Sequence, residues 1–215
     1  MKLYYYDHCP YCVRARMIFG LHGVPVEEAV LANDDEQTPI AMIGAKQLPI
    51  LQKDDSTFMG ESLDIVRYVD ETAGKGRLNE AVRQEVQAWF DEVGAYYNKL
   101  TWPRMIKTAL PEFAAESAVK YFTDKKERVI GSFAANLNKT AQYLERINAD
   151  LQTLAALKQA GEGMAGETGM EDILVFPLLR NLTIVRGIEW PSELADYVAQ
   201  MSEKTGVPLY FDRAL

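Results

Sequence analysis

The chain has 215 residues, of which 48% are hydrophobic, and a formal net charge of -8. This length and apolar content suffice for one large domain or two modest ones with a packed core. The negative net charge gives no general attraction to phosphate backbones or anionic lipid surfaces, so we expect neither nucleic acid nor a membrane as a partner.

The start of the chain, MKLYYYDHCPYC, lacks the uninterrupted apolar stretch of a secretory leader. Nowhere do about 18 apolar residues follow one another without a charge, which is the length that a membrane-spanning helix needs. We therefore expect a cytoplasmic protein.

The N-terminal third predicts a small α/β domain. Pro10 suits the first position of a helix, and Gly23 offers its end. Ser62 is expected to cap an amphipathic helix, and Lys53-Asp54-Asp55 to connect two strands of an antiparallel hairpin. The predicted order is strand, helix, strand, helix, strand, strand and helix, at 2–6, 10–21, 24–31, 38–43, 48–52, 56–59 and from residue 62.

The rest of the chain predicts helices. Helical periodicity recurs at 80–110, 118–157, 173–185 and 192–203. Pro103 is expected to kink or divide the first of these segments, and the nearly apolar third one to lie in the middle of a helical bundle. The short aperiodic segment after Thr72 predicts a domain boundary. The expected domains are 1–72 and 79–215, with a linker at 73–78.

The two cysteines lie in one motif, Cys9-Pro10-Tyr11-Cys12, where the first strand is expected to meet the first helix. At a helix N-terminus, unpaired N–H groups and the positive end of the helix dipole stabilise a thiolate, and Cys12 follows one turn deeper. This predicts Cys9 as a nucleophile that attacks a substrate disulfide. Cys12 or an incoming glutathione would then resolve the mixed disulfide.

Three other interpretations of the cysteines remain open. A structural zinc site needs four ligands, and only His8 and His22 are available beside the thiols. The cysteines could also be inert core residues. The third alternative is an iron–sulfur centre held by Cys9 together with external thiols. We favour the redox pair and expect no metal site and no permanently bound cofactor.

Three motifs together resemble the glutaredoxin 2 family, the large bacterial glutaredoxins with a glutathione-transferase-like fold. These motifs are Cys9-Pro10-Tyr11-Cys12, Leu48-Pro49 at the third strand, and Glu61-Ser62 at the following helix. The resemblance covers essentially the whole chain, including DILVFPLLRNLT at 172–183. It implies an α/β thioredoxin-like N-terminal domain plus an all-α C-terminal domain. It also implies a glutathione-dependent oxidoreductase that reduces protein disulfides and glutathione mixed disulfides.

The resemblance further implies how glutathione is held as a co-substrate. The Leu48 backbone pairs with its cysteinyl part like an added strand, beside a cis peptide bond at Pro49. Ser62 and its helix N-terminus take the γ-glutamyl carboxylate, and Glu61 takes the ammonium group. Tyr11 flanks the sulfur. The expected glutathione site thus consists of Cys9, Tyr11, Leu48, Pro49, Glu61 and Ser62.

These residues also have plain structural explanations. Pro49 would be tolerated at the start of any edge strand. Ser62 could be a helix cap without a ligand, and Tyr11 an exposed side chain in a turn. We prefer the binding roles because the same chain also carries the dithiol motif of the family that it resembles.

Two features of the C-terminal half are interpreted as structural. Residues 161–166 match the dinucleotide motif G-x-G-x-x-G, but they follow a predicted helix instead of a strand, so we expect an interhelical loop. In this fold the buried helix usually begins Ser/Thr-x-x-Asp, whereas here Gly169 precedes Asp172. Since glycine supplies no side-chain oxygen, a weaker or shifted helix start is expected.

Besides glutathione, the expected partners are disulfide-bonded or glutathionylated proteins, and the chain is expected to act as a monomer. Two other functions compete with this reading. A glutathione transferase would conjugate electrophiles, but such enzymes commonly activate glutathione with a Ser or Tyr hydroxyl, where this chain has a dithiol. A non-catalytic binding or regulatory module would leave Cys9 with the pKa of an ordinary thiol.

Overall fold

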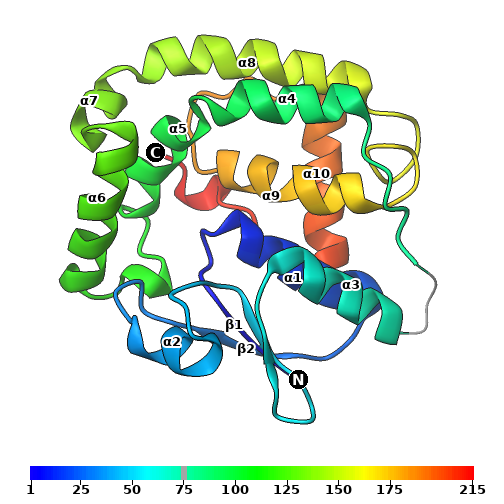
Figure 1. Ribbon diagram of the computed structural model, residues 1–215. Coiled ribbons are helices and arrows are strands. Elements are labelled where there is room, and N and C mark those ends of the chain that lie inside the picture. Colours follow the sequence, from blue (N-terminus) through cyan, green and yellow to red (C-terminus); the bar gives the residue numbers. More distant parts are fainter. Residues whose placement is uncertain (74–76) are drawn as a thin grey trace. The chain divides into compact units, whose positions relative to one another are not determined.

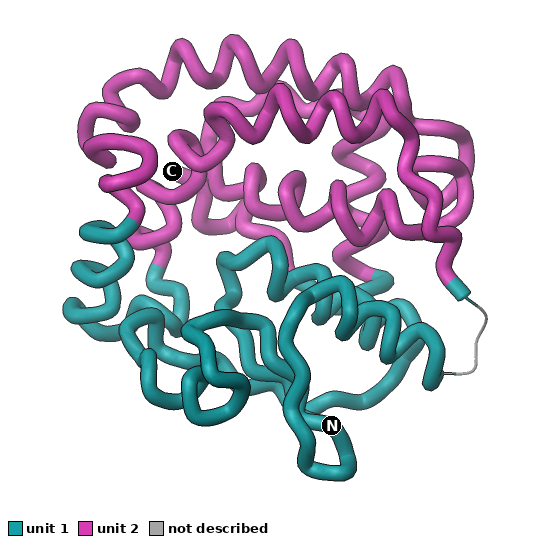
Figure 2. The backbone as a smooth tube through the Cα atoms, viewed as in Figure 1, with its two compact units in different colours: residues 1–77, 109–125, 204–207 teal, residues 78–108, 126–203, 208–215 magenta. Residues whose placement is uncertain are grey.

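The structure of the protein is a computed structural model, which describes residues 1–73 and 77–215. Within it the chain forms two compact units, shown in different colours in Figure 2. Unit 1 contains residues 1–77, 109–125 and 204–207, and unit 2 contains 78–108, 126–203 and 208–215. Positions 74–76 of the predicted linker lie outside the described residues.

The N-terminal part of unit 1 follows the predicted order of strands and helices. Its elements are β1 (Lys2–Tyr5), α1 (Pro10–His22), β2 (Glu27–Val30), α2 (Gln37–Ile43), β3 (Ile50–Gln52), β4 (Phe58–Met59) and α3 (Ser62–Thr72). Strand β2 is shorter than the predicted 24–31, because Pro25 has no N–H group to donate to a neighbouring strand. A short 3-10 helix, η1 (Pro111–Phe113), and the start of α6 (Glu116–Ile130) complete the unit.

The sheet of unit 1 is mixed. Its strand order is β2-β1-β3-β4, with β1 parallel to β2 and antiparallel to β3, and β3 and β4 form the predicted antiparallel hairpin. Helices α1 and α3 pack side by side (Figure 1). Helix α3 is amphipathic, as predicted, because Ile65, Val66 and Val69 are buried, whereas Leu63 is only half-buried.

Unit 2 is helical. It contains α4 (Gln84–Gly94), α5 (Tyr97–Met105), the end of α6, α7 (Phe133–Asn138), α8 (Thr140–Leu157), α9 (Met170–Leu182) and most of α10 (Ser192–Thr205), followed by the 3-10 helix η2 (Phe211–Arg213). Helices α4 and α8 run alongside each other (Figure 1), and α9 is buried along most of its length, as predicted.

Pro103 was expected to kink or divide the segment 80–110, and the division does not occur there. Pro103 lies inside α5, and the break between α4 and α5 falls at 95–96. Gly94 is the last residue of α4. Because glycine has the lowest helix propensity after proline, the helix ends there and not at Pro103.

Helix α9 begins at Met170, directly after Gly169, so the expected shift of its start does not occur. The Asp172 carboxylate accepts a hydrogen bond from the Gly169 N–H at 2.8 Å. It also accepts bonds from the Met164 N–H and from the Tyr197 hydroxyl, each at 2.8 Å. Asp172 therefore supplies half of a reciprocal cap even though glycine contributes no side chain.

Residues 161–166 form the expected loop between helices α8 and α9. The loop folds back on itself, with the Gly163 N–H donating to the Gly166 carbonyl oxygen at 3.0 Å. A Cβ atom at Gly163 would lie 2.1 Å from the carbonyl oxygen of Glu167. Glycine is thus needed here for a close approach of backbone to backbone, which explains this part of the motif without a phosphate ligand.

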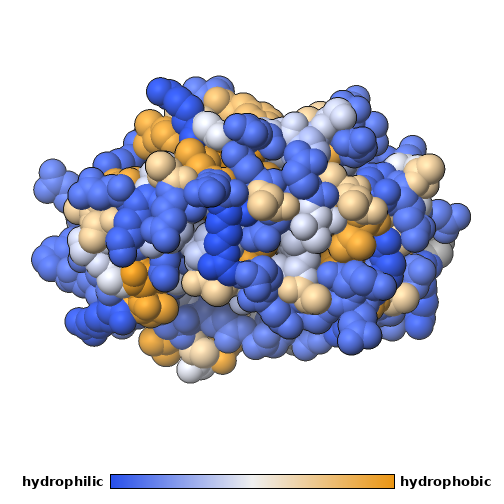
Figure 3. All heavy atoms as spheres, turned by 90° about the horizontal axis from the view of Figure 1, so that it is seen from above, coloured by the Kyte–Doolittle hydropathy of each residue, from blue (hydrophilic) through white to orange (hydrophobic). Residues whose placement is uncertain are grey.

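No described helix combines the length and the hydrophobicity of a membrane-spanning segment. On the face of the molecule shown in Figure 3, hydrophilic residues predominate and hydrophobic ones form separate patches. The exposed large hydrophobic side chains among the described residues are Tyr11, Ile40, Phe58, Val129, Phe211 and Leu215.

Candidate active site

The dithiol motif lies where strand β1 passes into helix α1. The Cys9 N–H donates to the Tyr6 carbonyl oxygen at 3.3 Å, which closes the turn between the two elements. Cys9 is the residue before the helix, with extended backbone angles (φ -77°, ψ 117°), and Pro10 is the first helical residue. The predicted placement of Cys9 at a helix N-terminus is confirmed.

The two thiols differ in their surroundings. Both are free, with Cys9 half-buried and Cys12 fully buried. Cys12 packs in an apolar cluster with Tyr5, Leu48 and Ile50, and the partly buried Cys9 packs against the same cluster. The Tyr6 N–H also donates to the Cys12 sulfur at 3.4 Å. Of the two sulfurs, Cys9 is therefore the one that a substrate in solution reaches first.

Hydrogen bonding and charge lower the pKa of Cys9 to about 6. The largest cause is a hydrogen bond with the Cys12 thiol. Burial acts in the opposite direction and raises the pKa of Cys9. The charge of His8 and the backbone N–H groups of Cys12 and Tyr11 lower it further. Burial in turn raises the pKa of Cys12 well above its ordinary value, with further contributions from Cys9. Near neutral pH the pair thus consists of a Cys9 thiolate and a Cys12 thiol that donates to it.

Leu48 and Pro49 lie beside the dithiol. The peptide bond between them is cis, as the resemblance implied. Both residues are buried, and Leu48 belongs to the apolar cluster that contains Cys12.

Glu61 and Ser62 form the start of helix α3, but not in the predicted way. Glu61, not Ser62, is the residue before the helix, and the buried Ser62 is its first residue. The prediction of Ser62 as the cap is therefore wrong by one position. Glu61 has a φ of 60° and a ψ of 110°. Such a conformation costs a non-glycine residue on the order of 1–3 kcal/mol and is found preferentially at ligand sites.

Tyr11 lies in the first turn of α1 and is 55% exposed. The Arg14 guanidinium lies 4.8 Å from the centre of its ring. Tyr11 is therefore accessible from solvent.

Two residues that the sequence analysis does not single out also contribute to this region. Gln47, directly before Leu48, donates from Nε2 to the Glu61 carboxylate at 2.6 Å and so connects two of the predicted glutathione-binding segments. Glu112 is fully buried and contacts His8. Neither has a local sequence signal, because each acts through a partner that is distant in the chain.

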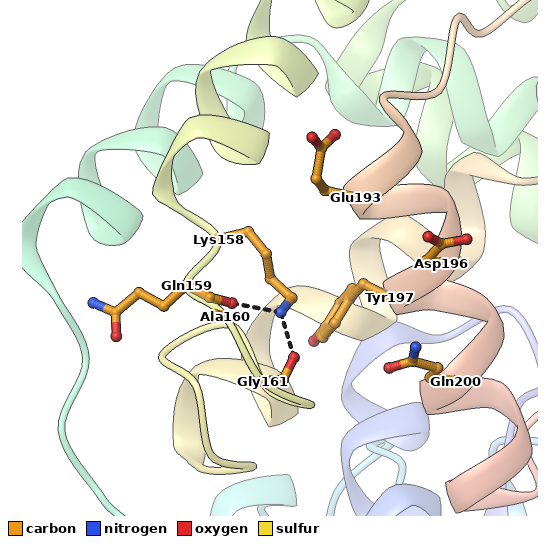
Figure 4. A pocket seen from close by; sticks show the side chains of 8 residues that line it. All are labelled: Lys158, Gln159, Ala160, Gly161, Glu193, Asp196, Tyr197 and Gln200. Carbon is orange, nitrogen blue, oxygen red and sulfur yellow. Dashed lines mark hydrogen bonds between the residues drawn. The ribbon is translucent and has the colours of Figure 1, made fainter.

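Among the described residues, no group of three or more His, Cys, Asp or Glu side chains could hold a metal ion. A pocket of about 350 Å³ occurs in unit 2, but it lacks thiols and imidazoles (Figure 4). Its Lys158 amine donates to the carbonyl oxygens of Gln159 and Gly161, at 2.8 Å each. The other lining residues are Ala160, Glu193, Asp196, Tyr197 and Gln200.

Comparison with protein families finds two matches along the chain. A family model described as "Glutathione S-transferase, N-terminal domain" matches residues 3–77. A second, described as "Glutaredoxin 2, C terminal domain", matches residues 85–214.

Individual relatives agree with these matches. The chain is 49% identical to glutaredoxin 2 of Escherichia coli (strain K12), over 100% of both chains. The crystal structure of glutaredoxin 2 from Salmonella typhimurium in complex with glutathione has 48% identity and a TM-score of 0.97, covering 100% of this chain and 98% of that one. A glutathione S-transferase from Rhodospirillum rubrum, 14% identical, has a TM-score of 0.60 over 96% and 86% of the two chains and shares the fold alone. The predicted thioredoxin-like N-terminal and helical C-terminal architecture is thereby confirmed.

Proposed function

Because this chain belongs to the glutaredoxin 2 family and is a glutathione-dependent thiol-disulfide oxidoreductase, we propose that Cys9 is its nucleophile and Cys12 its resolving thiol. The observation that carries the proposal is the opposite perturbation of the two thiols. The half-buried Cys9 has its pKa lowered to about 6, while the pKa of the buried Cys12 is raised. A nucleophile must be ionised and reachable, and a resolving thiol only needs to lie behind it.

The proposed reaction proceeds by two thiol-disulfide exchanges. The Cys9 thiolate attacks the glutathione sulfur of a mixed disulfide, the S–S bond breaks, and the substrate leaves as a thiolate that takes up a proton. Cys9 is now joined to glutathione. A second glutathione thiolate attacks that glutathione sulfur, which forms oxidised glutathione and regenerates the Cys9 thiolate.

A protein disulfide takes a second route. After Cys9 has formed a mixed disulfide with the protein, Cys12 loses its proton and attacks the Cys9 sulfur. The protein leaves fully reduced, and an intramolecular Cys9–Cys12 disulfide remains, which two glutathione molecules reduce in turn. This route needs both thiols, whereas the first needs only Cys9.

The glutathione site that we propose surrounds Cys9 with Tyr11, Leu48, Pro49, Glu61 and Ser62. Leu48 shares an apolar cluster with the dithiol, which supports its pairing with the cysteinyl part of glutathione. The hydrogen bond from Gln47 to Glu61 links this segment to the start of α3. There, the N–H groups of the helix N-terminus suit the γ-glutamyl carboxylate. The Salmonella typhimurium relative was crystallised with glutathione, which also supports the site.

We further propose that the chain acts in the cytoplasm as a monomer on disulfide-bonded or glutathionylated proteins. One chain carries both thiols that the reaction needs, and thiols stay reduced in the cytosol. We propose that residues 1–72 form the glutathione-binding redox domain, 73–78 a linker and 79–215 the helical domain.

Two serine variants test the proposed roles. Cys9→Ser should abolish turnover of a glutathione mixed disulfide, because a serine hydroxyl is not ionised near neutral pH. Cys12→Ser should keep part of that turnover but lose the reduction of protein disulfides, since glutathione replaces Cys12 only in the first route. The assay follows the formation of oxidised glutathione with each substrate. Full activity in Cys9→Ser would end the proposal.

A further inference from the structure

A buried histidine–carboxylate pair lies directly beside the nucleophile. His8, the residue before Cys9, is 7% exposed, and Glu112 of η1 is 0% exposed. The distance between His8 Nδ1 and Glu112 Oε1 is 2.6 Å, and the same oxygen accepts the His8 backbone N–H at 2.9 Å. The two residues are 104 positions apart in the chain, and both belong to unit 1.

The contacts of the pair define its protonation. His8 lowers the pKa of Glu112 by hydrogen bonding and charge, against the opposing effect of burial. An ionised carboxylate only accepts hydrogen bonds, so His8 Nδ1 must carry the proton that points at it. Within the described residues, Glu112 Oε2 accepts no hydrogen bond. The negative charge of Glu112 thus depends on His8 for compensation.

The imidazole ring is also held in place by aromatic rings. Its centre lies 5.8 Å from that of Tyr6, 5.0 Å from that of Phe113 and 5.1 Å from that of Phe122. Phe113 comes from the same 3-10 helix as Glu112, and Phe122 from α6. The ring of the residue that precedes Cys9 is therefore held on several sides.

We propose that His8 and Glu112 are positioning residues for the disulfide exchange, in which Glu112 holds the His8 ring in the place from which its charge stabilises the thiolate of Cys9. Without the carboxylate, the ring would lose the hydrogen bond at Nδ1 that fixes its orientation. The inference rests on the proposed role of Cys9 as the nucleophile, and it assigns to residues 111–113 a function in the chemistry of the N-terminal motif.

Other groups also set the charge state of Cys9. Tyr11, Cys12 and Arg14 act on it from α1, and Tyr6 acts on it from the turn after β1. A test must therefore change the histidine pair alone and leave these groups in place.

The chain contains a matched control pair. His22 Nε2 lies 2.7 Å from Asp70 Oδ1, and both residues are buried in unit 1. This second pair joins the last turn of α1 to α3, so it is at the end of α1 opposite to Cys9. Asp70→Asn therefore removes a buried histidine–carboxylate pair of the same kind without touching the dithiol.

The experiment compares Glu112→Gln with Asp70→Asn in the full reduced chain. Alkylation by iodoacetamide is followed between pH 4 and pH 9, and peptide mapping identifies the fraction of label on Cys9. We expect Glu112→Gln to raise the midpoint of Cys9 alkylation by about one pH unit, a change typical of losing a neighbouring charge. At pH 6 the rate should fall about fivefold, while Asp70→Asn keeps the wild-type midpoint.

An unchanged or lowered midpoint in Glu112→Gln overturns the inference, and so does an equal rise in Asp70→Asn. If Glu112→Gln does not fold, the double variant His8→Phe/Glu112→Leu replaces the pair by apolar groups and must show the same raised midpoint. The proposed function is judged separately by the activity of Cys9→Ser. Loss of turnover in Cys9→Ser with a normal midpoint in Glu112→Gln would reject only the positioning role.

Discussion

Replacing Cys12 by alanine tests what keeps Cys9 ionised. The hydrogen bond with the Cys12 thiol is the largest of the causes that lower the pKa of Cys9 to about 6. A hydrogen bond to a charged group contributes about 1.5–3 kcal/mol, which corresponds to about one to two pKa units. We therefore expect Cys12→Ala to raise the pKa of Cys9 to about 7 to 8.

The sign of the change follows from the charge of the acceptor. Cys12 donates to the thiolate, so its removal destabilises the charged form of Cys9 and raises the pH at which that form appears. At pH 7 the ionised share of Cys9 should fall from about nine-tenths to between about a half and about a tenth.

The measurement is a pH titration of the ultraviolet absorbance of the thiolate. Cys12→Ala contains a single cysteine, so the signal belongs to Cys9 alone. Cys12→Ser is the matched control, because its hydroxyl still donates a hydrogen bond at this position and should give an intermediate midpoint. A midpoint near 6 in the alanine variant would refute the reasoning, since the helix end and His8 would then suffice.

Two further predictions concern the glutathione site and the helical unit. Ser62→Ala should raise the KM for a glutathione mixed disulfide by on the order of tenfold and leave kcat within about twofold, because a hydroxyl bonded to a carboxylate contributes about 1.5 kcal/mol to binding. Steady-state kinetics check this, and an unchanged KM would contradict the role of Ser62. Asp172→Ala should lower the free energy of unfolding by about 3 kcal/mol or more, because the N–H groups of Gly169 and Met164 and the Tyr197 hydroxyl lose their acceptor. Urea unfolding measures this loss, and the alkylation rate of Cys9 should stay that of the wild type.

The sequence by itself determined the features that depend on neighbours in the chain. The start of α1 at Pro10 and the position of Cys9 before it follow from four consecutive residues, because a helix cap and its effect on a thiol are local. The order of strands and helices in the N-terminal part could also be predicted from the sequence, since strands and helices space their apolar residues differently. The cis peptide bond at Pro49 and the proposed glutathione-binding residues came from the resemblance, not from local patterns.

Only the tertiary structure decided the features that depend on distant contacts. Glu112 meets His8 across 104 positions, and Gln47 reaches Glu61 from another segment of the chain. The positive φ of Glu61 has no signal in the sequence either, because the residue type does not favour that conformation. Such pairings arise when packing brings residues of unrelated segments together, and no spacing within one segment records which partner a buried charge will find.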